Sequence, residues 1–342
     1  MDVFGPHAPE PFGSHEGEPV RRVTISDGAL SARVMEWGAV LQDLRLNGHD
    51  APLVLGFDRF DPYPAESPYF GAMAGRVANR IRHAEAPLDG RTVKLDANVR
   101  DVHHLHGGRR GLGRRVWEIV DHGPAHATLR ILSPDGEMGY PGALTAHVTY
   151  RVEGAALVVE TEAETDAPTW VNLAHHSYFN LYDGGRTPVL DHALRIDAER
   201  YLETDDDFIA GGDPRPVEGT RYDWREGRRV GEIVGPDGAP PIWDHNYCVA
   251  DARRAVTEVA RVEGPTGLAM VLSSTEPGVQ FYAGHKIATQ TPGLDGIAYG
   301  PRSGLCLETQ AWPDAPNNPA YPSVVLRPGE TYRQTTRHAF GR

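Results

Sequence analysis

The chain has few cysteines and no long apolar run. Its 342 residues contain only Cys248 and Cys306, too few for the disulfide framework of a small secreted protein. Both cysteines are typical of a reduced cytosol, which predicts a cytoplasmic location. No stretch approaches the roughly 20 apolar residues that a membrane-spanning helix needs, and residues 1–19 lack the basic start and apolar core of a signal peptide. We expect no membrane association.

Basic stripes and nucleotide-binding motifs are also absent. The 34 Lys and Arg residues are outnumbered by 47 Asp and Glu, for a net charge of -13. With no basic run to offset that charge, the sequence argues against nucleic acids and anionic membranes as partners. There is no P-loop, no dinucleotide-binding fingerprint and no G-x-S-x-G nucleophile elbow.

Glycine and proline are frequent, and they favour β structure. The chain has 38 Gly and 28 Pro, which leave little room for the 10–15-residue helices that a TIM barrel or doubly wound sheet needs between strands. Residues 144–152 alternate clearly between apolar and polar positions, as a half-buried strand does. Further strands are expected at residues 22–26, 30–37, 40–46, 116–120, 128–132, 157–165, 257–262, 268–274, 279–283 and 332–340.

This pattern predicts an all-β fold, a large antiparallel β-sandwich. Residues 1–19 are expected to form a loose N-terminal arm, and residues 20–342 a single domain. Residues 205–241 are polar and rich in glycine and proline, but strands continue on both sides of them. We therefore interpret them as a long excursion from that one domain.

One short apolar strand carries an acid. Residues 304–329, GLCLETQAWPDAPNNPAYPSVVLRPG, begin as a strand and continue as a stiff proline-rich loop. Alternation places Cys306, Glu308 and Gln310 on one face of this strand. A carboxylate in an apolar strand beneath such a loop indicates a partly desolvated base. The alternative is an edge-strand glutamate in water.

Two histidine clusters are candidate sites. In HHLHGG, residues 103–108, the spacing of His103, His104 and His106 admits either a metal site or a turn with polar histidines. In VNLAHHSYFNL, residues 171–181, His175 and His176 lie in an apolar and aromatic frame. A histidine in such a frame is either a hydrogen-bonded core residue or a tuned acid–base group.

Three further motifs carry polar groups that suit sugar hydroxyls. Arg76, Asn79 and Arg80 lie among small residues in GAMAGRVANRI, although a solvated surface arginine is the simpler interpretation. Asp244 in WDHN follows a pair of prolines and could simply form a turn. Gln280 in VQFYAG shares a strand face with an aromatic ring, an arrangement that suits either a sugar or a sheet core.

Taken in order, GRVANRI, LHGG, HHSYFNL, WDHNY, GVQFYAG and LETQAWPDAPNNPAYPS resemble the motifs of the aldose 1-epimerase (galactose mutarotase) family. The resemblance extends from about Gly71 to the C-terminus. It implies a many-stranded supersandwich of galactose mutarotase type, with no metal and no cofactor. The implied activity is interconversion of the α and β anomers of a free aldose, such as galactose or glucose.

The resemblance also implies roles for individual residues. By motif position, the catalytic base is Glu308 and the catalytic acid is His176. The implied substrate-binding residues are Arg80, Asn79, His106, Asp244 and Gln280. Two positions depart from the family pattern: His175 stands where asparagine is common, and Trp312 where phenylalanine is common. Both leave the preferred sugar open.

Three alternatives remain at this point. The chain could be a non-catalytic sugar-binding or sensor protein on the same fold, or a metal enzyme using His103, His104 or His106. It could also act on a hexose 6-phosphate, which requires basic residues over the far end of the sugar. The expected partner is a small aldose, without nucleic acid or membrane, and the protein is expected to be a monomer or homodimer.

Overall fold

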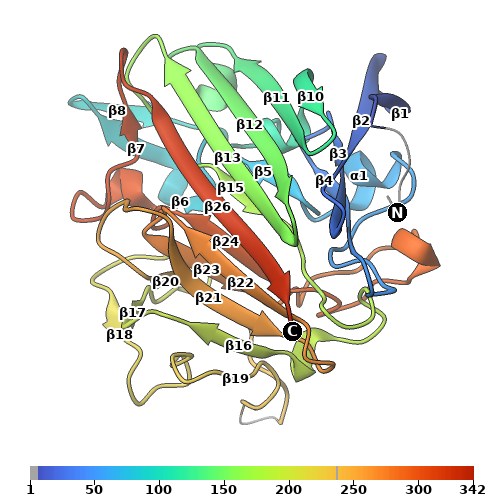
Figure 1. Ribbon diagram of the computed structural model, residues 1–342. Coiled ribbons are helices and arrows are strands. Elements are labelled where there is room, and N and C mark those ends of the chain that lie inside the picture. Colours follow the sequence, from blue (N-terminus) through green and yellow to red (C-terminus); the bar gives the residue numbers. More distant parts are fainter. Residues whose placement is uncertain (1–6, 236–237) are drawn as a thin grey trace.

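The computed structural model describes residues 7–235 and 238–342, and its regular structure is almost entirely β-strand (Figure 1). The α-helix found in these residues is the short α1, Pro62–Glu66. The remaining helical segments are short 3₁₀ turns at Arg82–Ala84, Leu112–Arg114, Glu137–Gly139, Val189–Asp191, Leu294–Gly296 and Ala315–Asn317. No helix of the described residues is long and apolar enough to cross a bilayer.

The largest layer is an antiparallel nine-stranded sheet, in which β26 lies between β13 and β22 (Figure 1). In sheet order its strands are β10 (Glu118–Gly123), β11 (His126–Ser133), β12 (Leu144–Glu153), β13 (Ala156–Thr165), β26 (Tyr332–Gly341), β22 (Ala269–Ser274), β21 (Thr257–Glu263), β16 (Ala193–Ile196) and β19 (Arg228–Arg229). In β12 every second side chain from Leu144 to Val152 is buried, so the alternation predicted from the sequence is confirmed.

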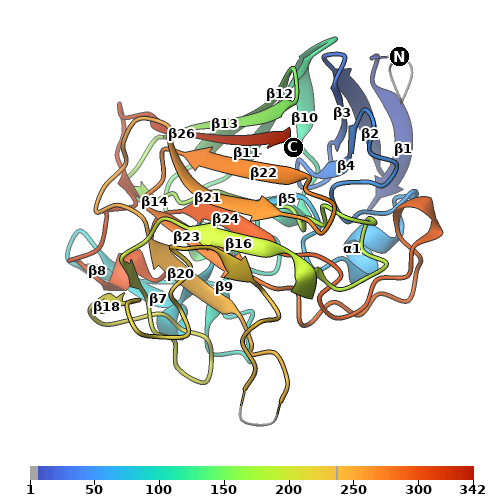
Figure 2. The same ribbon diagram turned by 60° about the horizontal axis from the view of Figure 1, so that its bottom comes forward.

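A five-stranded sheet packs against this layer and carries the candidate base, Glu308 (Figure 2). Its order is β18 (Arg215–Pro216), β17 (Arg200–Tyr201), β20 (Asp244–Cys248), β23 (Gly278–Tyr282) and β24 (Cys306–Gln310). Thr309 Oγ1 of β24 is 2.6 Å from Thr336 Oγ1 of β26, which joins the two sheets. Leu307 lies on the same face as Thr309 and belongs to the shared core. The antiparallel β-sandwich is therefore confirmed.

The N-terminal segment differs from the expected loose arm. Strands β1 (Glu10–His15), β2 (Glu18–Ser26), β3 (Leu30–Met35) and β4 (Leu41–Leu46) form a four-stranded sheet. β1 pairs with β2 around a turn at Gly17, and the Phe12 ring packs 6.5 Å from the ring of Phe60. This aromatic contact and the strand pairing order residues 10–15. Residues 1–6 lie outside the described part of the chain.

Short strand pairs complete the molecule and carry the remaining motifs. They are β5 (Ala72–Ala74) with β15 (Ala174–His176), β6 (Arg80–Ile81) with β9 (His104–Leu105), β7 (Glu85–Leu88) with β8 (Arg91–Lys94), and β14 (Thr169–Trp170) with β25 (Val325–Leu326). The expected polar excursion at residues 205–241 contributes β18 and β19 to the edges of the two large sheets.

Arg76 has a structural position, and the interpretation as a solvated surface arginine is wrong. Its side chain is 2% exposed. Its Nε donates to Ser133 Oγ at 2.9 Å, and its terminal nitrogens donate to the carbonyls of Ser133 and Pro134 at 2.9 Å and of Gly142 at 2.8 Å. The guanidinium therefore ties the end of β11, at Ser133, to both ends of the loop that leads into β12.

Replacement of Arg76 by methionine should destabilise the protein by about 3 kcal/mol, because several buried carbonyls lose a charged donor. Urea unfolding would measure this. The matched control is Arg91→Met on the exposed strand β8, where the expected change is within about 0.5 kcal/mol. Equal unfolding midpoints for the two variants would contradict the assigned role.

Candidate active site

Glu308 and His176 meet because their segments run antiparallel. The backbone groups of Phe179 and Leu305 exchange two hydrogen bonds, of 2.7 and 3.0 Å. Three residues back from Phe179 is His176, and three residues forward from Leu305 is Glu308, so this register sets the two side chains opposite each other. Glu308 Oε1 is 3.4 Å from His176 Nε2.

The pKa values of Glu308 and His176 are determined mainly by the burial of the two side chains. Glu308 is 2% exposed and His176 is 5% exposed, so the alternative of an edge-strand glutamate in water is wrong, although β24 is the outermost strand of its sheet. Desolvation is the largest cause that raises the pKa of Glu308, to about 8, and the Asp244 carboxylate adds to it while Arg80 opposes it. The raised pKa has the direction that the sequence predicted.

Desolvation also lowers the pKa of His176, to about 4, and Asp244 only partly opposes that shift. Burial therefore outweighs the help that the neighbouring carboxylate gives His176 in keeping its proton. Between pH values of about 4 and 8, these pKa values favour one transferable proton on the Glu308–His176 pair, held by the carboxyl group.

Aromatic rings fix the His176 imidazole. Tyr178 and Tyr69 stack on it at centroid distances of 5.1 and 5.9 Å, with interplanar angles of 29° and 28°. Cys306 Sγ is 3.5 Å from its Nδ1. The two tyrosine rings and the Cys306 thiol thus hold the ring while its Nε2 faces Glu308.

His106 is held as a neutral donor beside the pair. Its Nδ1 accepts a hydrogen bond from the backbone N–H of Asn79 at 3.1 Å, so the proton of the neutral ring is on Nε2. Burial holds the pKa of His106 well below its ordinary value. The ring lies 5.2 Å from that of His176. Asn79 Oδ1 accepts from the N–H of Arg80 at 2.8 Å, so Asn79 shapes this corner through its own turn.

Asp244, Gln280 and Arg80 form a polar group on the neighbouring strands. Gln280 lies opposite Glu308 in the β23–β24 register. Its Nε2 donates to Asp244 Oδ1 at 2.6 Å, and an Arg80 terminal nitrogen is 3.7 Å from Asp244 Oδ2. Glu308 Oε2, Gln280 Oε1 and Arg80 Nε are buried without a hydrogen-bond partner. Because such groups are normally paired, these atoms are suited to ligand hydroxyls.

Sequence reasoning missed three residues of this site. Cys306 and Tyr69 contact the His176 ring, and Phe208 lies in the segment expected to be a polar excursion. The Arg80 guanidinium lies 5.6 Å from the Phe208 ring centroid, and Lys286 Nζ lies 4.8 Å from it. Alternation did place Cys306 on the face of Glu308, but no sequence signal brings Tyr69 or Phe208 there.

The HHLHGG motif does not assemble a metal site of its own. His104 uses one ring nitrogen on the Asp96 carbonyl, 2.7 Å away, and the other on the Tyr140 hydroxyl, 2.6 Å away. The His103 ring accepts from the N–H of His83 at 3.1 Å. Within residues 7–235 and 238–342, the His and carboxylate groups that converge are instead His106, His176 and Glu308, with one donor atom of each within 4.8 Å of the others.

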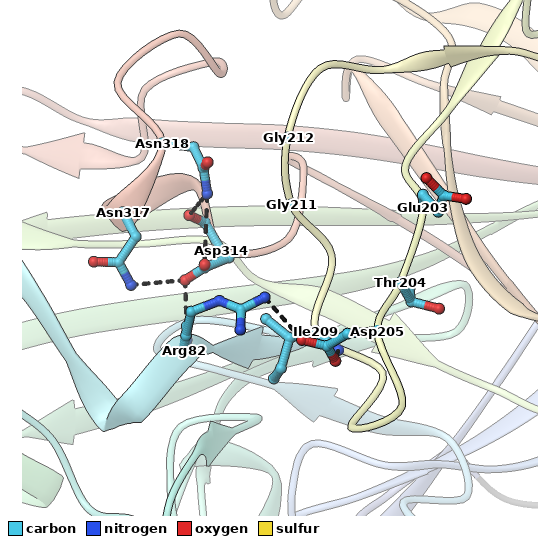
Figure 3. A pocket seen from close by; sticks show the side chains of 10 residues that line it. All are labelled: Arg82, Glu203, Thr204, Asp205, Ile209, Gly211, Gly212, Asp314, Asn317 and Asn318. Atoms are coloured by element: carbon cyan, nitrogen blue, oxygen red, sulfur yellow. Dashed lines mark hydrogen bonds and ion pairs between the residues drawn. The ribbon is translucent and has the colours of Figure 1, made fainter.

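A separate polar pocket of about 450 Å³ lies around Arg82 and Asp314 (Figure 3). It is lined by Arg82, Glu203, Thr204, Asp205, Ile209, Gly211, Gly212, Asp314, Asn317 and Asn318. Asp314 accepts from the Arg82 N–H at 3.0 Å and from Asn317 at 2.8 Å, and Arg82 donates to Asp205 at 2.9 Å. These groups satisfy one another, and neither Glu308 nor His176 lines the pocket. The candidate site is therefore the buried pair.

Comparisons with known proteins agree with this geometry. The aldose 1-epimerase family model matches residues 21–339. The chain belongs to the aldose 1-epimerase family. It is 36% identical to human galactose mutarotase over 329 residues, covering 95% of each chain. It is 32% identical to Escherichia coli aldose 1-epimerase over 338 residues, covering 95% of this chain and 96% of that one.

Solved structures from the family share the fold. The aldose epimerase homologue from C. elegans superposes with a TM-score of 0.87 at 30% identity, covering 94% of this chain and 98% of that one. Galactose 1-epimerase from Lactobacillus acidophilus gives a TM-score of 0.83 at 25% identity, covering 98% of both.

The two departures from the family pattern lie away from the pair. His175 points to the opposite side of β15, where its Nε2 is 3.0 Å from Ser177 Oγ and its ring lies 5.8 Å from that of His338. Trp312 donates through Nε1 to the Pro277 carbonyl at 3.0 Å. It packs in a small cluster with Leu202, Ala210, Cys248 and Tyr321. Neither side chain contacts the candidate sugar-binding residues in these interactions.

The raised pKa of Glu308 should appear in the pH dependence of stability. The folded-state pKa is about 8 against an ordinary value of 4.5, so the stability associated with the protonated carboxyl is lost as pH rises between these values. Glu308→Gln removes this titration. We expect the difference in free energy of unfolding, variant minus wild type, to increase from pH 5 to pH 8. Parallel stability curves in urea titrations over this range would contradict the shift.

Proposed function

We propose that this protein is an aldose 1-epimerase that interconverts the α and β anomers of a free aldose of the galactose or glucose type. The observation that carries the proposal is the buried carboxylate–imidazole pair, Glu308 and His176, with Oε1 and Nε2 3.4 Å apart. Membership of the family supports the same reaction. The substrate is drawn from the relatives named galactose mutarotase.

The reaction needs one base and one acid. The pair reaches its working form when the single proton moves from the Glu308 carboxyl to His176 Nε2. Glu308 then removes the proton of the anomeric hydroxyl, His176 protonates the ring oxygen, and the bond between the anomeric carbon and the ring oxygen breaks. The open aldehyde rotates about its first carbon–carbon bond and closes on the other face, with both transfers reversed. Each positioned group contributes roughly 10²–10⁴-fold.

The remaining polar groups orient the sugar. His106 Nε2–H and the Arg80 guanidinium donate to hydroxyls, and Asp244 and the Gln280 carbonyl oxygen accept from them. Asn79 acts on the substrate by fixing His106 and Arg80, on the basis of its hydrogen bonds to both. Orientation of this kind lowers the entropic part of the barrier.

Two wider assignments go with this function. We propose that residues 20–342 act as one domain, because its core cluster extends from Val23 to Phe340. We also propose a cytoplasmic location, which the two buried free cysteines support.

Glu308→Gln should lower the catalysed anomerisation rate at least about 100-fold, because an amide cannot accept the hydroxyl proton. Polarimetry of freshly dissolved α-galactose and α-glucose measures this rate after subtraction of the uncatalysed reaction. Sugar binding by saturation-transfer NMR serves as the control for a folded site. A near-normal rate would end the assignment of Glu308.

His176→Asn should likewise slow the reaction by about two orders of magnitude or more, since no proton is delivered to the ring oxygen. A loss of less than tenfold would point to a different acid. Assays with and without EDTA separate this mechanism from the metal alternative, because proton transfer by the pair is insensitive to chelation. A panel of galactose, glucose, xylose and glucose 6-phosphate would identify the preferred sugar.

A further inference from the structure

One strand holds both nitrogens of the His176 imidazole. Glu308 lies at Nε2 and Cys306 at Nδ1, with separations of 3.4 and 3.5 Å. The two residues are two positions apart on β24, so their side chains leave the strand on the same face. The stacked tyrosines prevent the ring from turning away. The contact between sulfur and Nδ1 therefore persists whenever the pair is assembled.

The positions of the imidazole protons follow from these contacts of Glu308 with Nε2 and of Cys306 with Nδ1. The raised pKa of Glu308 favours its protonated form, in which the carboxyl group 3.4 Å from Nε2 is the donor and the ring proton is on Nδ1. In the working state both nitrogens carry protons, and Nε2 gives its proton to the ring oxygen of the sugar. The Nδ1 proton thus stays in place throughout the cycle and faces Cys306 Sγ.

A thiol is an unusual partner for this position because its sulfur accepts hydrogen bonds weakly. Burial raises the pKa of the Cys306 thiol well above its ordinary value, and the carboxyl groups of Glu308 and Asp244 add to that effect. The thiol is therefore neutral. A weak neutral acceptor orients the imidazole but stabilises its cationic form less than an oxygen would, which leaves His176 a stronger acid.

We propose that Cys306 is a positioning residue that fixes the Nδ1–H tautomer of His176 and sets its acidity through a weak sulfur acceptor. This inference rests on the proposed function, in which His176 is the acid. The other titratable groups around His176 are Glu308 on β24, Tyr178 and His175 on its own segment, Tyr69 before β5, and His106 after β9, with Asp244 acting at longer range. Substitutions at Cys306 leave these groups unchanged.

The test compares Cys306→Ser and Cys306→Ala with Cys248→Ser, a matched control at the other buried cysteine on β20. Serine offers a stronger oxygen acceptor, which favours the imidazolium and should move the acidic limb of the pH profile of kcat upward by about 0.5–1 pH unit. Alanine removes the acceptor and should lower kcat roughly twofold to tenfold, without an upward shift of that limb. Cys248→Ser should reproduce the wild-type profile.

A direct readout is the ¹⁵N chemical shift of the His176 ring nitrogens, which reports the tautomer. We expect a protonated Nδ1 in wild type at pH 6 and a mixture of tautomers in Cys306→Ala. The inference is overturned if the Cys306→Ser and wild-type pH profiles superimpose, or if the neutral ring carries its proton on Nε2. Full activity in His176→Asn would instead overturn the proposed function, so the two failures are distinguishable.

Discussion

The exclusion of water from one carboxyl group and one imidazole dominates this site. Burying a charged carboxylate or imidazolium costs free energy. Both pKa values therefore shift in the direction that favours the neutral forms, to about 8 for Glu308 and about 4 for His176. The pair nevertheless retains one proton between these values. The working ion pair differs from the resting neutral pair only in the position of that proton, so the site needs no exchange with solvent to become active.

The fold holds Glu308 and His176 in this geometry through its main chain. β24 packs one face on the core through Leu307 and bonds to the nine-stranded sheet through Thr309. Its other face carries Cys306 and Glu308. Because the backbone register between Leu305 and Phe179 is set by two hydrogen bonds, the separation of base and acid is determined by main-chain geometry. Their side chains need only keep their rotamers.

Much of the architecture could be predicted from the sequence. The strict alternation of apolar and polar residues predicted the burial pattern of β12, and the frequent turn residues argued against a helical fold. Glu308 and its burial followed from an apolar strand under a proline-rich loop, whereas the pairing with His176 came from a family resemblance. The sequence pattern could not identify strand β1, because this strand is held in place by contact with the ring of Phe60, which is distant in the sequence. His104 is a structural residue and His106 lies at the candidate site, and this difference depends on tertiary contacts that the local spacing does not encode.

The choice of groups around His176 shows how acidity and position can be set separately. The tyrosine stack restrains the plane of the ring, and the Asp244 carboxylate acts on its charge from a distance. A carboxylate at Nδ1 would restrain the ring equally well, but it would also stabilise the imidazolium and weaken the acid. A neutral thiol at 3.5 Å supplies direction with little charge stabilisation. Within a buried site, a poor hydrogen-bond acceptor can therefore serve an acid better than a strong one.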